Sequence, residues 1–174
     1  MATATPSAPP PRTAPVDTTK APRRALRFTC LDCLRQELDR IAAAQRAGTL
    51  ETTGNWSAGE ILDHCSVTFE AGLDGGLPPV PWFGRVLGRL FKSAVLKPGG
   101  MKPGWKFPKD AKELAPRPGV TFDQGMARLR RCLDRLAAGE RMTHPSPFLG
   151  PLTHEEWVRL NLNHTELHLS FIRP

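Results

Sequence analysis

The sequence predicts an all-α fold, a four-helix bundle with a long crossover between its second and third helices. Four stretches carry apolar residues at the three- and four-residue spacing of an amphipathic helix. Three of them begin at a Ser or Thr that is followed three residues later by Glu or Gln, the capping-box pattern of a helix start. A connection rich in Pro and Gly, far longer than an ordinary interhelical loop, separates the second stretch from the third. A connection of this kind lets those two helices run parallel.

The first helix is predicted over residues 29–47, where Gly48 ends it. The second is predicted over residues 57–73. Its start is marked by the Ser57 capping box and by Trp56, which precedes the cap as one half of a hydrophobic staple. The inward face of the second helix carries Ile61, His64, Cys65, Thr68 and Gly72.

The third helix is predicted over residues 122–138, with a capping box formed by Thr121 and Gln124. The fourth begins after Thr153, whose capping-box partner is Glu156, and runs almost to the end of the chain. Its inward face carries Trp157, Leu160, Asn161, His164, Leu167, His168 and Phe171.

The crossover contains one further short helix, over residues 82–96. It has a wide apolar stripe, and basic residues flank it. We expect the stripe to roof the open end of the bundle. The alternative is an interaction helix, in which Trp82, Arg85, Arg89 and Lys92 meet a partner protein or, less favoured, a membrane surface.

The composition is that of an ordinary globular protein, with 40% hydrophobic and 24% charged residues in 174. Residues 1–24 hold many Pro and Ala and few large apolar side chains, so we expect a disordered tail there and one folded domain over residues 25–174. The tail lacks the apolar core of a secretory signal, and no apolar run approaches the roughly 20 residues of a membrane-spanning helix. The sequence therefore predicts a cytoplasmic protein.

The net charge of +7 permits anionic partners. However, the basic residues do not line one face of a predicted recognition helix, and the chain has no zinc-finger spacing. We expect no nucleic-acid partner.

The four cysteines, Cys30, Cys33, Cys65 and Cys132, are expected to be reduced thiols in a cytoplasmic chain. Cys30 and Cys33 have the spacing of a redox pair. No strand precedes them, however, and we favour two small residues in a first helical turn.

Three histidines are predicted to converge. His164 and His168 are four residues apart, so a helix places them about 40° apart on one face and about 6 Å apart along its axis. His64 occupies the inward face of the second helix. If the second and fourth helices are antiparallel, all three imidazoles lie at one level of the bundle.

Three imidazoles without a carboxylate or thiolate suit zinc best, with nickel or ferrous iron as alternatives. Three protein ligands leave one position for water or substrate, as in catalytic sites. Glu166 lies about 200° around the helix from His164, on the outer face. The segment is therefore not the HExxH motif of a metalloprotease.

Three further residues are candidates for a supporting or substrate-contacting role: Asn161, Trp157 and Cys65. Asn161 precedes His164 by one turn and could orient a ligand or substrate. A core amide satisfied by the backbone is an equal alternative. Cys65 lies about 100° around the helix from His64, which favours a packing role.

Three segments resemble the DinB-like superfamily, and more narrowly its branch of bacterial proteins known only as a domain of unknown function. They are TTGNWSAGEILDHC (52–65), PSPFLGPLTHEEW (145–157) and NHTELHLSF (163–171). The resemblance spans residues 26–172. It implies a four-helix bundle with a long crossover and a metal site at His64, His164 and His168.

The resemblance also implies an activity. Characterised members of the superfamily include metal-dependent transferases and isomerases that use low-molecular-weight thiols such as mycothiol or bacillithiol. We therefore expect a metal-dependent thiol S-transferase with a small-molecule substrate, in which the metal binds the cosubstrate thiol as a thiolate. A homodimer is compatible with such a bundle. The alternative is a non-catalytic binding protein that uses the basic crossover helix, with the metal structural or absent.

Overall fold

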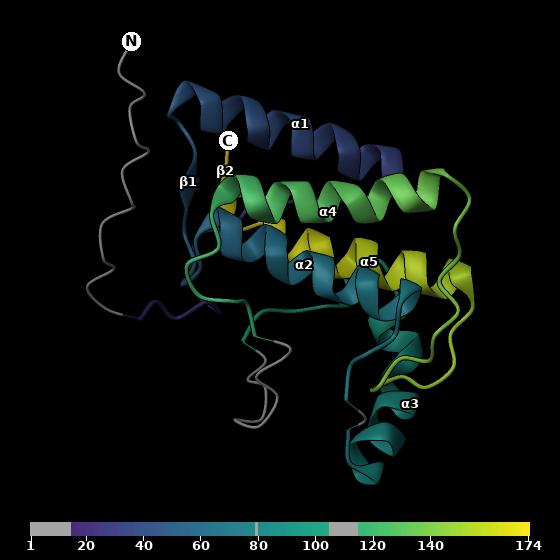
Figure 1. The fold of residues 1–174 in the computed structure, drawn as a ribbon. Coiled ribbons are helices and arrows are strands. Elements are labelled where there is room, and N and C mark those ends of the chain that lie inside the picture. Colours follow the sequence, from purple (N-terminus) through teal and green to yellow (C-terminus); the bar gives the residue numbers. More distant parts are fainter. Residues whose placement is uncertain (1–14, 79, 105–114) are drawn as a thin grey trace.

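The computed structural model describes residues 15–78, 80–104 and 115–174. In this part of the chain the fold is mostly helical, as predicted, with five helices and a small two-stranded sheet (Figure 1). The elements in chain order are α1 (Leu31–Ala47), β1 (Glu51–Thr52), α2 (Ala58–Leu73), α3 (Trp82–Leu96), α4 (Phe122–Ala137), α5 (His154–Leu169) and β2 (Ile172–Arg173). Each predicted helix is present, whereas the sheet was not predicted.

The helix starts follow the sequence signals. Ser57, Thr121 and Thr153 each accept a hydrogen bond from the backbone N–H three residues ahead, and the Glu or Gln at that position returns the bond. Gly48 closes α1 with φ of 71°, a left-handed conformation that glycine adopts without steric cost. These local signals fix where α2, α4 and α5 begin, and so fix the height of each side chain along them.

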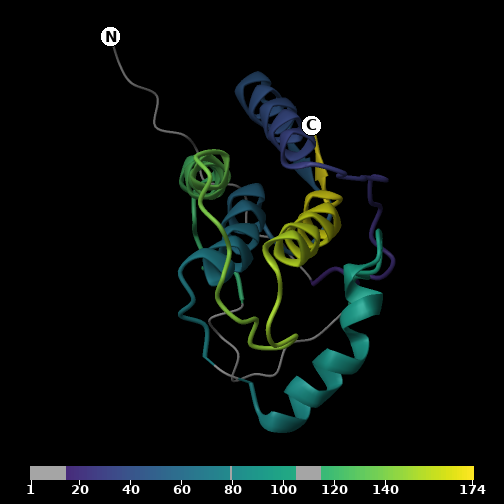
Figure 2. The same ribbon diagram turned by 90° about the vertical axis from the view of Figure 1, so that its right-hand side faces the viewer.

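The α2 helix lies beside both α4 and α5, parallel to α4 and antiparallel to α5 (Figures 1 and 2). Glycines allow α2 and α4 to approach closely. A Cβ added to Gly125 would lie 2.4 Å from the carbonyl oxygen of Gly59, and one added to Gly59 would lie 2.4 Å from that of Val120. The opposite directions of α2 and α5 are the arrangement that the predicted histidine site requires.

The sheet joins two distant parts of the chain. Glu51 pairs with Arg173, and Thr52 with Ile172, in antiparallel register. Arg24 supports this corner, because its Nε donates to the carbonyl oxygen of Ile172.

Residues 1–14 of the predicted tail lie outside the described residues. The described remainder contacts the helical domain, for example through a 2.6 Å ion pair between Arg24 and Glu37. The domain boundary at residue 24 stays a prediction. In the described part of the chain, every helix is too short or too polar to cross a membrane.

The α3 helix contacts α5, and its N-terminal end lies away from the other four helices (Figure 2). Its C-terminal end is anchored, because Leu96 is buried and Asn163 Nδ2 donates to the carbonyl oxygens of Val95 and Lys97 at 2.9 Å. The large apolar side chains toward its N-terminal end are exposed: Trp82, Val86, Leu87, Leu90 and Phe91. The prediction that this stripe roofs the bundle is wrong for these five residues.

Candidate metal centre

The structure brings His64, His164 and His168 together. The ring centroid of His64 lies 4.9 Å from that of His164 and 4.5 Å from that of His168, and the last two are 4.5 Å apart. One nitrogen from each ring lies within 4.8 Å of the others, and this group could hold a metal ion. Three nitrogens around tetrahedral zinc are about 3.3 Å apart, a spacing that lies within this limit. The two helices supply ligands at one level because they are antiparallel.

The imidazoles of His164 and His168 are held in their neutral forms. Burial lowers the pKa of His164 well below its ordinary value, and the charge of His64 lowers it further. Burial is also the main cause that lowers the pKa of His168, followed by the charges of His164 and His64. A neutral imidazole has a lone pair on one nitrogen, which is the form that binds a metal.

A hydrogen bond fixes which nitrogen of His164 faces the cluster. The Thr68 hydroxyl donates to the carbonyl oxygen of Cys65 at 3.0 Å, and Thr68 Oγ1 itself lies 3.2 Å from His164 Nδ1. Since the hydroxyl hydrogen is already used, Nδ1–H is the donor to Thr68 Oγ1. The lone pair of His164 is then on Nε2, as in metal-binding histidines whose other nitrogen is held by a neighbour.

Trp56 covers the cluster from the side. Its ring stacks on His168 with centroids 5.3 Å apart and planes 18° from parallel, and it lies 5.0 Å from His64. The sequence predicted Trp56 only as a staple residue at the start of α2. Its contact with His168 depends on how α5 packs against the loop before α2, which the sequence pattern does not reveal.

The carboxylates nearest in sequence to the histidines are engaged elsewhere. Asp63 is fully buried and binds Arg117 and Arg128. Burial acts to raise the pKa of Asp63, but the hydrogen bonds from these two arginines outweigh it, and the net pKa is lowered. Asp63 is therefore an ionised carboxylate that is paired with arginines on the side of α2 that faces α4.

Glu166 is also occupied by a partner. Its Oε1 accepts a hydrogen bond from the backbone N–H of Phe28, and Arg27 lies 3.6 Å from Oε2. The prediction of an outer-face residue needs correction, because the segment before α1 covers Glu166 and buries it. In the described part of the chain, the ligand group thus consists of three imidazoles without a carboxylate.

The three supporting candidates are buried, and their hydrogen bonds run to other groups. Trp157 Nε1 donates to the carbonyl oxygen of His144 at 2.8 Å. Asn161 Nδ2 donates to the carbonyl oxygen of Trp157 at 3.0 Å. Burial raises the pKa of Cys65 to about 12, so this residue is a neutral thiol. A role for any of them toward a substrate stays a prediction.

The residues proposed for an interaction helix do not share one environment. Trp82 is 74% exposed. Lys92 instead pairs with Glu156 of α5 at 2.8 Å, and a Cβ added to Gly150 would lie 3.3 Å from Arg89 Nε. The basic side chains of Arg89 and Lys92 therefore lie beside the connection into α5. The side chain of Arg85 is outside the described part.

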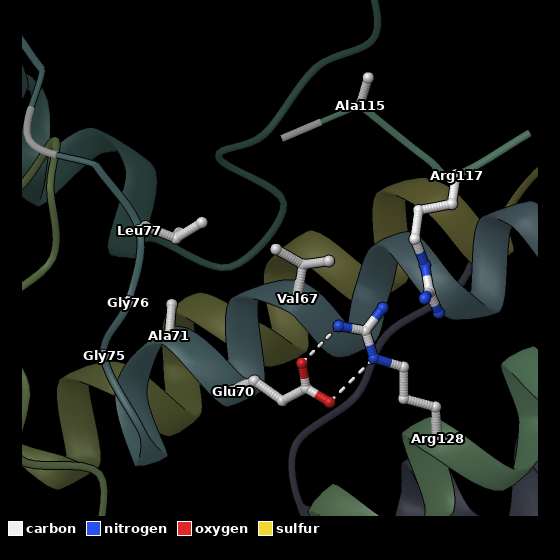
Figure 3. Close-up of a pocket in the computed structure, with 9 residues that line it drawn as sticks. All are labelled: Val67, Glu70, Ala71, Gly75, Gly76, Leu77, Ala115, Arg117 and Arg128. Atoms are coloured by element: carbon white, nitrogen blue, oxygen red, sulfur yellow. Dashed lines mark hydrogen bonds and ion pairs between the residues drawn. The ribbon is translucent and has the colours of Figure 1, made fainter. Parts of the chain in front are cut away.

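A separate concavity of about 290 Å³ lies beside α2, away from the histidines (Figure 3). Val67, Ala71 and Leu77 give it an apolar wall. Its polar wall is an ion pair in which Arg128 donates to both oxygens of Glu70. The charges at this surface thus largely neutralise each other.

The structure corrects the expectation of four reduced cysteines. Cys30 and Cys33 form a disulfide at the start of α1, whereas Cys65 and Cys132 are free and buried. Cys30 is the N-cap of that helix, and its Sγ accepts a hydrogen bond from the N–H of Cys33 at 3.1 Å. The first-turn position was predicted, but the bond between the sulfurs was not.

Comparison with known proteins gives one match. Residues 20–174 match a family model described as "Protein of unknown function (DUF1569)". Neither the curated proteins nor the solved structures contain a match to the chain.

Proposed function

Because the chain belongs to the DUF1569 family of proteins of unknown function, we propose its function from its site: a metal-dependent enzyme on a DinB-like four-helix bundle. His64, His164 and His168 hold one divalent ion in this proposal. The observation that supports it is the convergence of three imidazoles from antiparallel helices, of which burial keeps His164 and His168 neutral. The helices α1, α2, α4 and α5 form the bundle, and α3 belongs to the crossover between α2 and α4.

The donor set favours zinc, with nickel or ferrous iron as alternatives. Calcium and magnesium prefer oxygen ligands, and the nearby carboxylates of Asp63 and Glu166 are bound to arginines or backbone. Three protein ligands leave a coordination position open for a small molecule. This open position distinguishes a catalytic site from a closed structural one.

We propose thiol S-transfer as the reaction, with a low-molecular-weight thiol as cosubstrate and a small electrophile as substrate. The bound metal would supply the chemistry by stabilising the thiolate form of the cosubstrate. Thr68 holds the His164 ring in the required orientation, and Trp56 shields one side of the cluster from water. This division of roles does not require a carboxylate base beside the histidines.

The first test measures bound metal. The chain is purified without a histidine tag, and zinc, nickel and iron are counted by mass spectrometry. We expect about one ion per chain, lost in a His64→Ala/His168→Ala variant. A His144→Ala variant is the matched control, because this exposed histidine lies outside the cluster. A wild type that neither contains these metals nor takes them up would disprove the site.

The second test measures turnover with panels of small thiols and electrophiles. A metal-loaded wild type that conjugates them should lose the activity in His168→Ala. Equal rates in wild type and variant would contradict thiol transfer even if the metal is present.

A second candidate function is binding to another protein chain through α3. It is favoured by the exposed apolar residues on that helix, among them Trp82 and Leu90, each about three-quarters exposed. A second copy of the chain is the simplest partner, because an apolar patch can pair with itself about a twofold axis. Sedimentation velocity of the wild type and of Leu90→Ser tests this. A monomeric wild type would exclude the dimer, and flotation with anionic vesicles would indicate a membrane instead.

A further inference from the structure

We propose that Cys30 and Cys33 form a thiol-exchanging disulfide, a second reactive site that accepts small thiols and small disulfides. The two cysteines are joined across a sequence separation of three at the first turn of α1. Cys30 is exposed and lies just outside the helix, whereas Cys33 is half-buried and packs against the core. This site is separate from the histidine cluster and does not depend on a metal.

The small loop favours a reactive role over a structural one. A disulfide stabilises a fold chiefly by restricting the unfolded chain, and the effect grows with the length of the loop that it closes. A loop of this size restricts the unfolded chain very little. The sequence predicts a cytoplasmic chain, and disulfides in such a reducing compartment are usually catalytic or redox-sensing. The exposed position of Cys30 meets the remaining requirement, because an external thiolate can reach its sulfur.

The geometry assigns a role to each sulfur. The N–H of Cys33 donates to Cys30 Sγ at 3.1 Å, and this sulfur also lies at the positive end of the α1 dipole. Negative charge on Cys30 is therefore stabilised. Cys30 is also the accessible sulfur, so it carries the bond to an external thiol. Thr29 Oγ1 lies 3.6 Å from Cys33 Sγ and can donate to it when this sulfur leaves as a thiolate.

The exchange balances without a further oxidant or reductant. A small thiolate attacks Cys30 Sγ, the bond between Cys30 and Cys33 breaks, and its electron pair leaves on Cys33 Sγ, which takes up a proton. A second small thiolate then attacks the small-molecule sulfur of the mixed disulfide and releases the Cys30 thiolate. Two thiols have been oxidised to one small disulfide, and the protein disulfide has been reduced to two thiols. The reverse sequence restores it.

The other two cysteines provide an internal control. Cys65 and Cys132 are buried, and burial raises the pKa of each thiol to about 12. In the folded protein they should not react while Cys30 and Cys33 exchange.

The test uses the full chain in its native state, with glutathione as the small thiol. The protein is equilibrated at graded ratios of reduced to oxidised glutathione, quenched with acid and alkylated, and its peptides are analysed by mass spectrometry. We expect reversible conversion of the Cys30–Cys33 peptide between disulfide and dithiol, with no glutathione attached to Cys65 or Cys132. Reduction that requires a denaturant, or a chain that never forms the disulfide, would overturn the proposal.

Single variants test the assigned roles. Cys33→Ser leaves the exposed sulfur and should form a stable mixed disulfide with oxidised glutathione. Cys30→Ser leaves the half-buried sulfur and should react about tenfold more slowly. Circular dichroism melting of both variants verifies that they are folded. Equal rates would overturn the assignment of Cys30 as the sulfur that exchanges with external thiols and disulfides.

Discussion

Thr68 on α2 and His164 on α5 are joined by a 3.2 Å hydrogen bond between Oγ1 and Nδ1. The bond crosses the interface between the two antiparallel helices that carry the histidine cluster. It therefore links the packing of α2 against α5 to the orientation of one imidazole. A residue that makes no contact with a metal can in this way set the geometry of the site.

Thr68→Val should weaken metal binding, because valine keeps the shape of threonine and removes the acceptor of His164 Nδ1–H. We expect a loss of affinity of about 10- to 100-fold for zinc. Competition with a chromophoric chelator measures it. Thr68→Ser, which retains the hydroxyl, should stay within a few-fold of wild type. Equal weakening in both variants would mean that packing, and not the hydrogen bond, supports the site.

Zinc should stabilise the folded chain only when the histidines are present. At free zinc of about 100 times Kd, a ligand that binds only the native state adds about 2.7 kcal/mol to the free energy of unfolding. For a domain of this size the midpoint temperature should rise by roughly 5–10 °C. Differential scanning calorimetry with zinc and with a chelator checks this. A rise that persists in His64→Ala/His168→Ala would point to zinc bound elsewhere.

Gly125→Ala should destabilise the fold, although alanine is normally the better helix residue. The new Cβ would lie 2.4 Å from the carbonyl oxygen of Gly59, so α2 and α4 must separate. We expect a loss of about 1–3 kcal/mol in the free energy of unfolding, measured in urea. Gly84→Ala in α3 is the control, because its Cβ meets only Val80, at 3.5 Å. That variant should be neutral or slightly more stable, and a loss of similar size there would contradict the steric explanation.

Glu156 has two functions, which a pair of substitutions can separate. Its Oε2 accepts from Lys92 at 2.8 Å and from the backbone N–H of Thr153 at 3.0 Å. Glu156→Gln retains the cap and removes the charge, so unfolding in urea should show a loss below about 1 kcal/mol. Glu156→Ala removes both the cap and the charge, and its free energy of unfolding should fall by about 1 kcal/mol more. Equal losses would show that the cap contributes nothing.

The Glu156 carboxylate should also make the free energy of unfolding depend on pH, with a sign that follows from its pKa. Lys92, followed by the backbone at Thr153, lowers the pKa of Glu156 in the folded chain. A lowered pKa means that the folded state binds the proton less readily than the unfolded state. The stabilisation that ionised Glu156 contributes is complete above the ordinary Glu pKa of 4.5. It is lost as pH falls through the lower pKa of Glu156 in the folded chain. The stability difference between wild type and Glu156→Gln should therefore shrink on acidification, and a difference that does not change with pH would contradict it.

The helices and the histidine cluster could be predicted from sequence because their signals are local. Ser57, Thr121 and Thr153 mark helix starts within four residues of chain, and helical periodicity fixes the relative directions of His164 and His168. The cluster then needed one further assumption, that the second and fourth predicted helices are antiparallel. The long crossover supported that assumption.

The surroundings of the cluster could not be predicted, because they depend on contacts between residues far apart in the chain. Trp56 stacks on His168, and Glu166 binds the backbone of Phe28, across more than a hundred residues. The exposure of α3 is a further example. An apolar stripe such as that of Trp82 and Leu90 has the same sequence pattern whether a neighbour covers it or not.

The two-stranded sheet has a consequence for the candidate metal site. His168 lies in the last turn of α5, where an isolated helix frays and a ligand would be poorly placed. Here Phe171 N–H donates to the carbonyl oxygen of His168, and Ile172 pairs with Thr52 immediately afterwards. The chain beyond the helix is thus tied to the segment that leads into α2. Slow amide hydrogen exchange at Phe171 and Ile172 would show that strand pairing restrains the end of α5, which carries His168.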